Sequence, residues 1–489
     1  MQIKTLSFMV FSLSINVFFS SAAHAMPEEK LNTHNSTIIP NLILQKNGKL
    51  DEVKAQLSQV GVPELDDLWN TRRDIVDGVC DDKQNNCRAI SVFPGKNSDH
   101  PVVMLPGFTA YRKLYLEQIY DLIQSGYGPI YISDFTGTGD SYKPELKPGQ
   151  HLPTINEYMA SLKPDMEPEL HQKIVSIVGE KDADQMRKAI GELPIGRGYI
   201  RKFSDYTNDI DLLMNIAVKE NPTNKIMLTS LSMSGLNLAL ALATQGKHPV
   251  WISSVDRIVL ESPMIRIRAT DKVIPKVGML SDLVTLVGGD LFGSSTIVVK
   301  RGAVLQFVDK ALGNFNPDNT VSHSPIRISL TDGVRVWNGH ETGGGTFGWA
   351  YEELTHQYAL DPLDILPLVT ISLNQRVPQI AKALKDNNIT LITVASEADP
   401  LVDTSATKSF VQDLAEAGVT QSSLCLFQTA KHQIDIETDK YREPFMSLLY
   451  DQKDHQIKSS YGLAPRNELL ECAPVVKKAK PEVKQDDES

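Results

Sequence analysis

The segment Lys225–Gly235, which reads KIMLTSLSMSG, decides the fold predicted for this chain. A short apolar run ends in three serines at alternate positions, and an apolar helical pattern then begins at Leu236. We therefore predict a strand, a sharp turn and a helix, with Ser232 at the apex of the turn. Such a turn pushes one hydroxyl beyond the edge of a sheet, where a base can take its proton.

The residues two positions before and after the apex are expected to be small, because the strained backbone leaves little room there. Ser230 and Ser234 occupy these positions, whereas turns of this type usually have glycine, which adopts positive φ easily. The alternative is a serine-rich loop in which Ser232 or Ser234 caps the following helix. A catalytic turn needs partners elsewhere in the chain.

Two later strands end in residues that suit a nucleophilic serine. The strand ITLITVA runs into SEADPLVD, which contains Asp399, and the strand SSLCLF runs into QTAKHQIDIE, which contains His432. A histidine takes the serine proton, and a carboxylate fixes the tautomer of that histidine. We predict Ser232 as nucleophile, His432 as base and Asp399 as acid, with Glu397 and Asp403 as rival carboxylates.

A backbone turn near the start of the sheet is a candidate oxyanion hole. The segment Leu105–Phe108 follows an early strand, and the N–H groups of Phe108 and Met233 are the predicted donors. Removing one such donor typically costs about 3 kcal/mol of transition-state stabilisation. The same turn also fits a plain loop. The nearby GTGDS turn (137–141) lacks the lysine and the spacing of a phosphate loop, so we interpret it as a structural turn.

Buried, unalternating strands separated by helices indicate a mostly parallel sheet with helices on both faces, an α/β fold. Two long excursions interrupt this order, the first at residues 142–199 and the second at residues 266–377. Neither contains an obvious strand of the sheet. Excursions of this kind usually cover the carboxyl edge of the sheet, where ligands bind. The predicted organisation comprises a signal peptide (1–25), an N-terminal extension (26–60), a core (61–265 and 378–465) with an insertion (142–199), a largely helical cap (266–377) and a disordered tail (473–489).

The first 25 residues have the features of an export signal. Lys4 precedes an apolar run from Leu6 to Phe19, and Ala23, His24 and Ala25 provide a cleavage site after Ala25. The alternative is an uncleaved N-terminal anchor. Export predicts a periplasmic or secreted protein in an oxidising compartment.

Four cysteines follow the predicted cleavage site. Cys80 and Cys87 bracket a polar turn between two strand-like segments, which favours a disulfide across a hairpin. No histidine or cysteine lies beside them at ligand spacing, so a metal site is poorly supported. Cys425 and Cys472 either pair with each other or leave Cys425 as a buried thiol.

The net charge of −11 argues against nucleic acid as a partner, because proteins that bind nucleic acid usually carry a basic stripe. We predict no metal and no cofactor. The expected partner is a small ester or lipid substrate, with transient contact with a membrane surface.

With these motifs assembled, the chain resembles the lysophospholipase L2 branch of the α/β-hydrolase family, which also includes monoacylglycerol lipases. The similarity covers roughly residues 95–270 and 340–450, on the segments VVMLPGFTAYRKLYLEQIYDL, SDFTGTGDS, KFSDYTNDID, LTSLSMSG, LESPM, NTVSHSPIR, GGGTFGW, ASEADPLVD and AKHQIDIETD. The resemblance implies an α/β-hydrolase fold with Ser232, Asp399 and His432 as the triad and Phe108 with Met233 as oxyanion donors. The chain departs from the family in three ways: serines replace the two glycines that flank the nucleophile, Leu231 stands where the family often has histidine, and the insertion from Tyr142 to Tyr199 is longer than expected.

We therefore expect an exported serine esterase that hydrolyses the ester of a single-chain lipid, a lysophospholipid or a monoacylglycerol. A general carboxylesterase or a prolyl-aminopeptidase-like enzyme on the same fold is the alternative, and the latter needs an acidic cap residue such as Glu157, Glu169 or Glu341 to hold a substrate amine. A lipid-binding protein of hydrolase fold without turnover is the alternative from another class.

Overall fold

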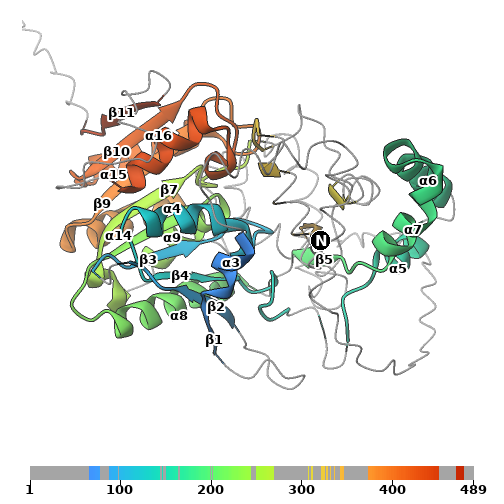
Figure 1. Cartoon of the computed structure of the whole chain (residues 1–489). Helices are drawn as coiled ribbons and strands as arrows, with labels where there is room; N and C mark the ends of the chain where they lie inside the picture. The colour runs from blue at the N-terminus through green and yellow to red at the C-terminus, as the bar shows by residue number, and fades with distance from the viewer. Residues whose placement is uncertain are drawn as a thin grey trace, which may run out of the picture.

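A nine-stranded sheet between two layers of helices dominates the computed structural model of the chain (Figure 1). The structure describes residues 65–77, 88–96, 99–143, 146, 150–162, 166–198, 200, 202–243, 249–268, 373–450 and 470–477, with short pieces between 307 and 345. The helices of the first excursion form a group apart from this sheet, on the right of Figure 1.

The central strands of the sheet are parallel, and its margins are antiparallel. Across the sheet the strands are β1 (Arg73–Asp77), β2 (Arg88–Phe93), β4 (Ile130–Ser133), β3 (Val102–Leu105), β6 (Ile226–Leu231), β7 (Val255–Glu261), β9 (Thr390–Ser396), β10 (Ser422–Phe427) and β11 (Leu470–Pro474). All pairs from β4 to β10 are parallel, whereas β1–β2, β2–β4 and β10–β11 are antiparallel. This order confirms the predicted α/β sheet.

Both faces of the sheet are buried, which explains why its strands read as continuous apolar runs. In β3, Val103 and Leu105 belong to one hydrophobic cluster and Val102 and Met104 to the other, because successive side chains point to opposite faces. The first cluster is covered by α8 (Ser204–Glu220), α9 (Met233–Leu242), α14 (Leu373–Asp386) and α15 (Thr404–Glu416). The second is covered by α3 (Leu65–Asn70), α4 (Leu116–Gln124) and α16 (Asp439–Tyr450).

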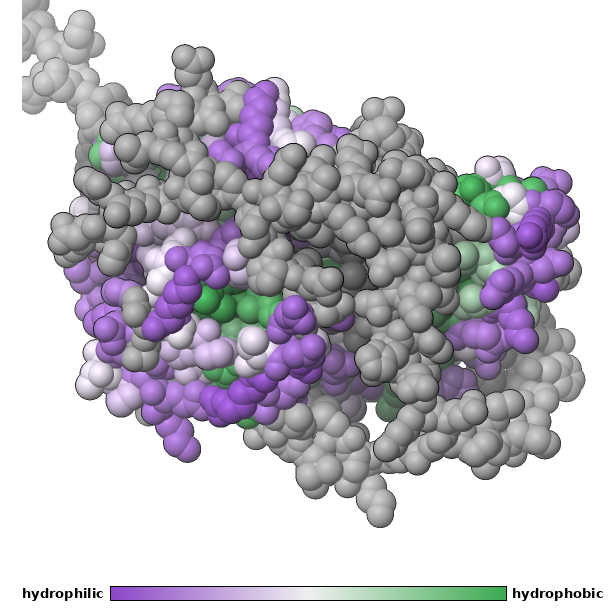
Figure 2. Space-filling view, in the orientation of Figure 1, coloured by the Kyte–Doolittle hydropathy of each residue, from purple (hydrophilic) through white to green (hydrophobic). Residues whose placement is uncertain are grey.

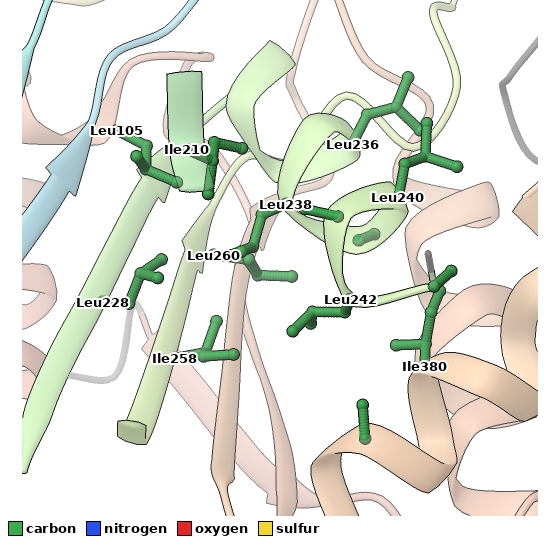
Figure 3. Close-up of a cluster of buried hydrophobic side chains, with 14 of the residues drawn as sticks. Leu105, Ile210, Leu228, Leu236, Leu238, Leu240, Leu242, Ile258, Leu260 and Ile380 are labelled. Carbon is green, nitrogen blue, oxygen red and sulfur yellow. The ribbon is translucent and has the colours of Figure 1, made fainter. Parts of the chain in front are cut away.

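Helix α9, which follows Ser232, is buried along its whole length. Figure 3 shows Leu238 and Leu242 of α9 between the sheet and α14, beside Ile258 and Leu260 of β7 and Ile380 of α14. A helix that is apolar on every side is stable only inside a larger core. The apex at Ser232 therefore rests on a rigid support.

The two excursions contact each other. Helices α5 (Ile155–Leu162), α6 (Met166–Val178) and α7 (Glu180–Gly191) share a separate hydrophobic cluster with Phe307 and Ala311 of the second excursion. Strand β5 (Gly196–Gly198) pairs with β8 (Thr342–Gly345). The described residues of the two excursions contribute no strand to the main sheet, and this small second sheet was not expected from the sequence.

The domain boundaries need three corrections. The core resumes at Leu373 rather than at residue 378, because α14 contains Pro378 and buries Leu373 and Val377 on the same side as Ile380. The core also extends beyond residue 465 to β11. The predicted tail began at residue 473, yet Ala473 is paired with β10. The predicted signal peptide and N-terminal extension, and residues 478–489, lie outside the described residues.

One of the two cysteine questions is answered. Cys425 and Cys472 lie opposite each other in the β10–β11 pair and form a disulfide. The strands on either side of Cys80 and Cys87 are β1 and β2, which pair antiparallel as a hairpin requires. The two cysteines themselves lie outside the described residues, so their disulfide stays a prediction.

The described surface is mainly hydrophilic on the face shown in Figure 2. Three large apolar side chains are exposed in the described part of the chain: Val250, Leu401 and Val476. No helix among the described residues is both long enough and apolar enough to cross a bilayer.

Candidate active site

Ser232 lies at the apex of a tight turn between β6 and α9. Its backbone has φ 56° and ψ −116°, a conformation that costs free energy in a residue with a side chain. Three hydrogen bonds hold it: Ser232 N–H donates to the carbonyl of Glu261 at 2.9 Å, and its carbonyl accepts from Gly235 N–H at 2.9 Å and from Met264 N–H at 2.8 Å. The turn predicted from the sequence is present, and strand β7 supports it.

The three predicted catalytic side chains form one hydrogen-bonded chain. His432 Nε2 lies 2.8 Å from Ser232 Oγ, and His432 Nδ1 lies 2.7 Å from Asp399 Oδ2. The other oxygen of Asp399 accepts from the N–H groups of Leu401 at 2.8 Å and Val402 at 3.0 Å. Asp399 is fully buried and His432 is 5% exposed. A carboxylate held in this way keeps the imidazole in the tautomer that can accept the serine proton.

The rival carboxylates have other partners. Glu397 pairs with Lys408. Asp403 caps α15 by accepting from Ser405 N–H at 2.9 Å, and it also pairs with Arg266. Of the three carboxylates that the sequence left open, Asp399 is the one that the structure places on His432.

The two flanking serines differ in their surroundings. Ser234 Oγ lies 2.8 Å from the carbonyl oxygen of Leu105 and 2.9 Å from that of Leu231, and it accepts from Leu231 N–H at 2.9 Å. The hydroxyl of Ser230 is buried and has no hydrogen-bond partner in the described part of the chain. Ser234 therefore links α9 to β3 through a hydrogen bond.

The position where glycine is required is 235, one residue beyond the expected flank. A Cβ atom on Gly235 would lie 2.6 Å from Cβ and 3.0 Å from Cα of Pro263. Real Cβ atoms do not approach so closely. The small residues expected at positions 230 and 234 are both buried, and the close approach of α9 to the turn after β7 at Gly235 is an additional constraint.

The predicted oxyanion turn packs against the nucleophile turn. A Cβ atom on Gly107 would lie 3.3 Å from the carbonyl oxygen of Leu231, the residue before Ser232. Gly107 N–H donates to the hydroxyl of Tyr115 at 2.9 Å, and Thr109 has φ 63°. Met233 is the first residue of α9, where an N–H has no acceptor within its own helix.

The GTGDS turn is held by a carboxylate of the protein. Asp134 accepts from Asp140 N–H and from Arg112 N–H, each at 2.8 Å. A Cβ atom on Gly139, whose φ is 51°, would lie 2.2 Å from Asp134 Oδ2. Burial raises the pKa of Asp134, and the charge of Arg112 opposes this rise. The predicted structural turn is confirmed, and Asp134 links it to the segment that follows Phe108.

Contacts with the second excursion were not foreseen from the sequence. The carboxylate of Glu437, which is fully buried, accepts from Lys431 N–H at 2.7 Å and bonds His323 Nδ1 at 2.9 Å. Gln433 N–H donates to the carbonyl of Val321 at 2.9 Å. These contacts hold both neighbours of His432. The only signal in the sequence was the segment NTVSHSPIR, and it did not indicate which partner it contacts.

No cluster of three or more His, Cys, Asp or Glu side chains suited to a metal ion occurs within the described residues.

The chain was compared with solved structures, curated sequences and family models. Solved structures with a similar fold include a soluble variant of monoglyceride lipase from Saccharomyces cerevisiae (14% identity, 77% of this chain and 92% of that chain covered, TM-score 0.44). Others are a carboxyl esterase from Bacillus coagulans (12%, 78% and 98%, TM-score 0.46) and a monoacylglycerol lipase from Paleococcus ferrophilus (15%, 75% and 97%, TM-score 0.41). Curated protein sequences gave no match.

A family model described as serine aminopeptidase, S33, matches residues 190–439, which include all three residues of the hydrogen-bonded chain. The match covers just over half of the 489 residues. The predicted α/β-hydrolase fold is thus confirmed, and the chain belongs to the serine aminopeptidase, S33, family of hydrolases.

Proposed function

We propose that the protein is an exported serine esterase that hydrolyses the carboxylic ester of a single-chain lipid, a lysophospholipid or a monoacylglycerol. The observation that carries the proposal is the chain from Ser232 Oγ through His432 to Asp399, with contacts of 2.8 and 2.7 Å at a strained turn. Membership of a hydrolase family and the lipases and esterases among proteins of similar fold support it.

The proposed reaction proceeds in two steps. His432 Nε2 takes the proton of Ser232 while Oγ attacks the ester carbonyl, and the N–H groups of Phe108 and Met233 bind the developing oxyanion. His432 returns the proton to the glycerol-side oxygen as the C–O bond breaks, which leaves an acyl group on Ser232. Water, deprotonated by His432, then attacks the acyl group, and the fatty acid leaves as Ser232 regains its proton.

The first experiment measures hydrolysis of a chromogenic short-chain ester by the purified protein. We expect turnover by the wild type and its loss in Ser232→Ala. Labelling by a fluorophosphonate separates an enzyme from a lipid-binding protein of the same fold, because only an activated serine reacts. Unchanged hydrolysis in Ser232→Ala would refute the assignment.

A panel of lysophospholipids, monoacylglycerols and aminoacyl amides tests the substrate class. The amides are included because the family is described as serine aminopeptidase. One acidic candidate for binding a substrate amine, Glu157, uses its carboxylate to accept Thr154 N–H at 2.8 Å in a capping box of α5. We therefore expect the esters to be the better substrates, and a preference for the amides would contradict the proposal.

Export is tested by the N-terminus of the protein recovered from cells. We expect the mature chain to begin at Met26, after cleavage behind Ala25. Recovery of a chain that still begins at residue 1 would favour the anchored alternative.

A further inference from the structure

Glu261 connects the elements that carry Ser232 and Asp399. It is the last residue of β7, and β7 lies between β6, which leads to Ser232, and β9, which leads to Asp399. Its carbonyl oxygen accepts the Ser232 N–H at 2.9 Å. The main chain of Glu261 therefore fixes the backbone of the proposed nucleophile.

The side chain of the same residue reaches the loop that carries His432. Glu261 Oε1 accepts the N–H groups of Ile434 at 2.7 Å and of Asp435 at 2.8 Å. These two residues follow His432 by two and three positions and begin the short 3₁₀ helix Ile434–Ile436. Glu261 is 2% exposed, so water does not compete for these donors.

We propose that Glu261 is a positioning residue, which holds the histidine loop to the nucleophile turn and thereby sets the contact between Ser232 Oγ and His432 Nε2. The inference rests on the proposed function, because it assigns a role within the same hydrolytic site. Glu261 contacts Ser232 through its main chain and Ile434 and Asp435 through its side chain, so a single residue connects the two loops.

The carboxyl group of Asp435 influences whether the side chain of Glu261 is protonated while it holds the histidine loop. The carboxyl groups of Glu261 and Asp435 are both buried and close enough for the charge of one to act on the other. The charge of Asp435 disfavours ionisation of Glu261, because two neighbouring buried carboxylates repel each other. Arg442 donates from Nε to the carbonyl of Asp435 at 2.8 Å, and its charge favours the ionised form of Asp435. These charges favour the protonated form of Glu261 and the ionised form of Asp435.

Charged and titratable groups on the neighbouring elements interact with this pair: Tyr115, Glu117, Arg442 and the amide of Gln433. Arg335 in turn interacts with Tyr115. Burial, followed by the charge of Asp435, raises the pKa of Glu261 well above its usual range. Loss of the proton at alkaline pH would place two negative charges side by side in a buried site, where like charges repel strongly. We expect this to displace the histidine loop.

The experiment compares Glu261→Gln and Glu261→Leu with the wild type, using kcat and KM for a chromogenic ester. Glutamine reproduces the protonated form, with an oxygen that accepts both N–H groups and an NH2 that donates to Asp435. Leucine fills the space without an acceptor. For the leucine variant we expect kcat to fall about 100-fold with KM changed less than about threefold, since small displacements of reacting groups act on the chemical step.

The glutamine variant is the decisive control. We expect it to retain most of the wild-type kcat at neutral pH and to lack the alkaline fall of kcat that deprotonation of Glu261 causes in the wild type. A leucine variant with wild-type kcat, a glutamine variant as impaired as the leucine variant, or identical alkaline profiles for glutamine and wild type would each overturn the inference. If Glu261→Leu does not fold, the pH profiles of kcat for the wild type and Glu261→Gln test the inference by themselves.

The same experiment separates this inference from the proposed function. Ester hydrolysis by the wild type that is lost in Ser232→Ala establishes the enzyme, and the Glu261 variants then test positioning alone. Absence of hydrolysis and of fluorophosphonate labelling in the wild type refutes the proposed function instead.

Discussion

The hydroxyl of Ser234 lies 2.8 Å from the carbonyl oxygen of Leu105, and it joins helix α9 to the end of strand β3. Leu105 is two residues before Gly107, where the predicted oxyanion turn begins. Ser234 stands where turns of this type usually have glycine, and its hydroxyl links the nucleophile turn to the oxyanion turn by a hydrogen bond. The matching serine on the other side of the apex, Ser230, makes no such contact within the described residues.

The two flanking serines should therefore respond differently to alanine. We expect Ser234→Ala to lower the free energy of unfolding by about 1–3 kcal/mol, because it leaves buried backbone groups of Leu105 and Leu231 without this partner. For Ser230→Ala we expect a change within about 0.5 kcal/mol, since no hydrogen bond is lost. Urea unfolding of both variants measures the difference. Equal losses in the two variants would contradict this account.

Removing the charge of Asp399 should abolish most activity without unfolding the protein. An asparagine at this position keeps an oxygen that can accept from Leu401 and Val402, but its amide stabilises the wrong tautomer of His432. We expect Asp399→Asn to lower kcat about 10⁴-fold, as the equivalent change does in serine proteases. Turnover of a chromogenic ester, with circular dichroism as the check on folding, measures the loss.

Glu397→Gln is the control for this prediction, because Glu397 lies two residues away and pairs with Lys408 at the surface. We expect it to leave kcat within about twofold of the wild type, as surface ion pairs contribute little. A large loss in Glu397→Gln together with a small one in Asp399→Asn would transfer the role to Glu397.

Stability in acid should depend on Glu117. Burial raises the pKa of this carboxyl, but Arg442 and Arg327 outweigh burial and lower the pKa below its usual range. Arg327 Nη2 lies 2.8 Å from Glu117 Oε1. Because the pKa is lowered in the folded protein, the ionised carboxylate stabilises the fold at pH values above the usual pKa of a glutamate. This contribution is lost as the pH falls through the lowered pKa.

We expect Glu117→Gln to cost about 3 kcal/mol at neutral pH, because it leaves two largely buried arginines without this charge. The difference between variant and wild type should shrink as the pH falls and the wild-type carboxylate takes up its proton. Urea unfolding over a series of pH values measures this trend. Glu416→Gln is the control, because Glu416 is exposed at the surface and should show little difference at any pH. A constant difference for Glu117→Gln would refute the assignment.

The disulfide between Cys425 and Cys472 should contribute to stability through the chain it closes. The two residues are 47 positions apart, and linking them restricts the unfolded chain. We expect replacement of both by serine to lower the free energy of unfolding by about 2–4 kcal/mol. Treatment of the wild type with a reductant should have a comparable effect. If the double variant is still sensitive to the reductant, the predicted disulfide between Cys80 and Cys87 explains the remainder.

Much of the core could be predicted because its signals are local. Buried strands on both faces give apolar runs, and β3, β6, β9 and β10 each lie within or beside a predicted strand. Ser232, Asp399 and His432 could be selected because each follows a strand of one parallel sheet, and the ends of such strands meet at one edge. The structure places the three side chains in contact, as their order in the chain suggested.

Other features could not be predicted because they depend on residues far apart in sequence. Nothing near Glu261 indicates that its side chain meets Ile434 and Asp435. The short segment that forms β11 has one partly buried residue, Leu470, followed by exposed ones, so it lacks the apolar pattern of a strand. It pairs with β10 over its whole length, and the disulfide between Cys425 and Cys472 links the two strands.

Strand β11 also covers β10, which would otherwise be the last strand of the sheet on that side. An open edge presents unpaired N–H and C=O groups to which a strand of another molecule can add. A chain cut before Leu470 would expose β10 next to the loop that carries His432. Such a shortened chain should associate through this edge, so the final residues of the sheet protect the protein from aggregation as well as completing its fold.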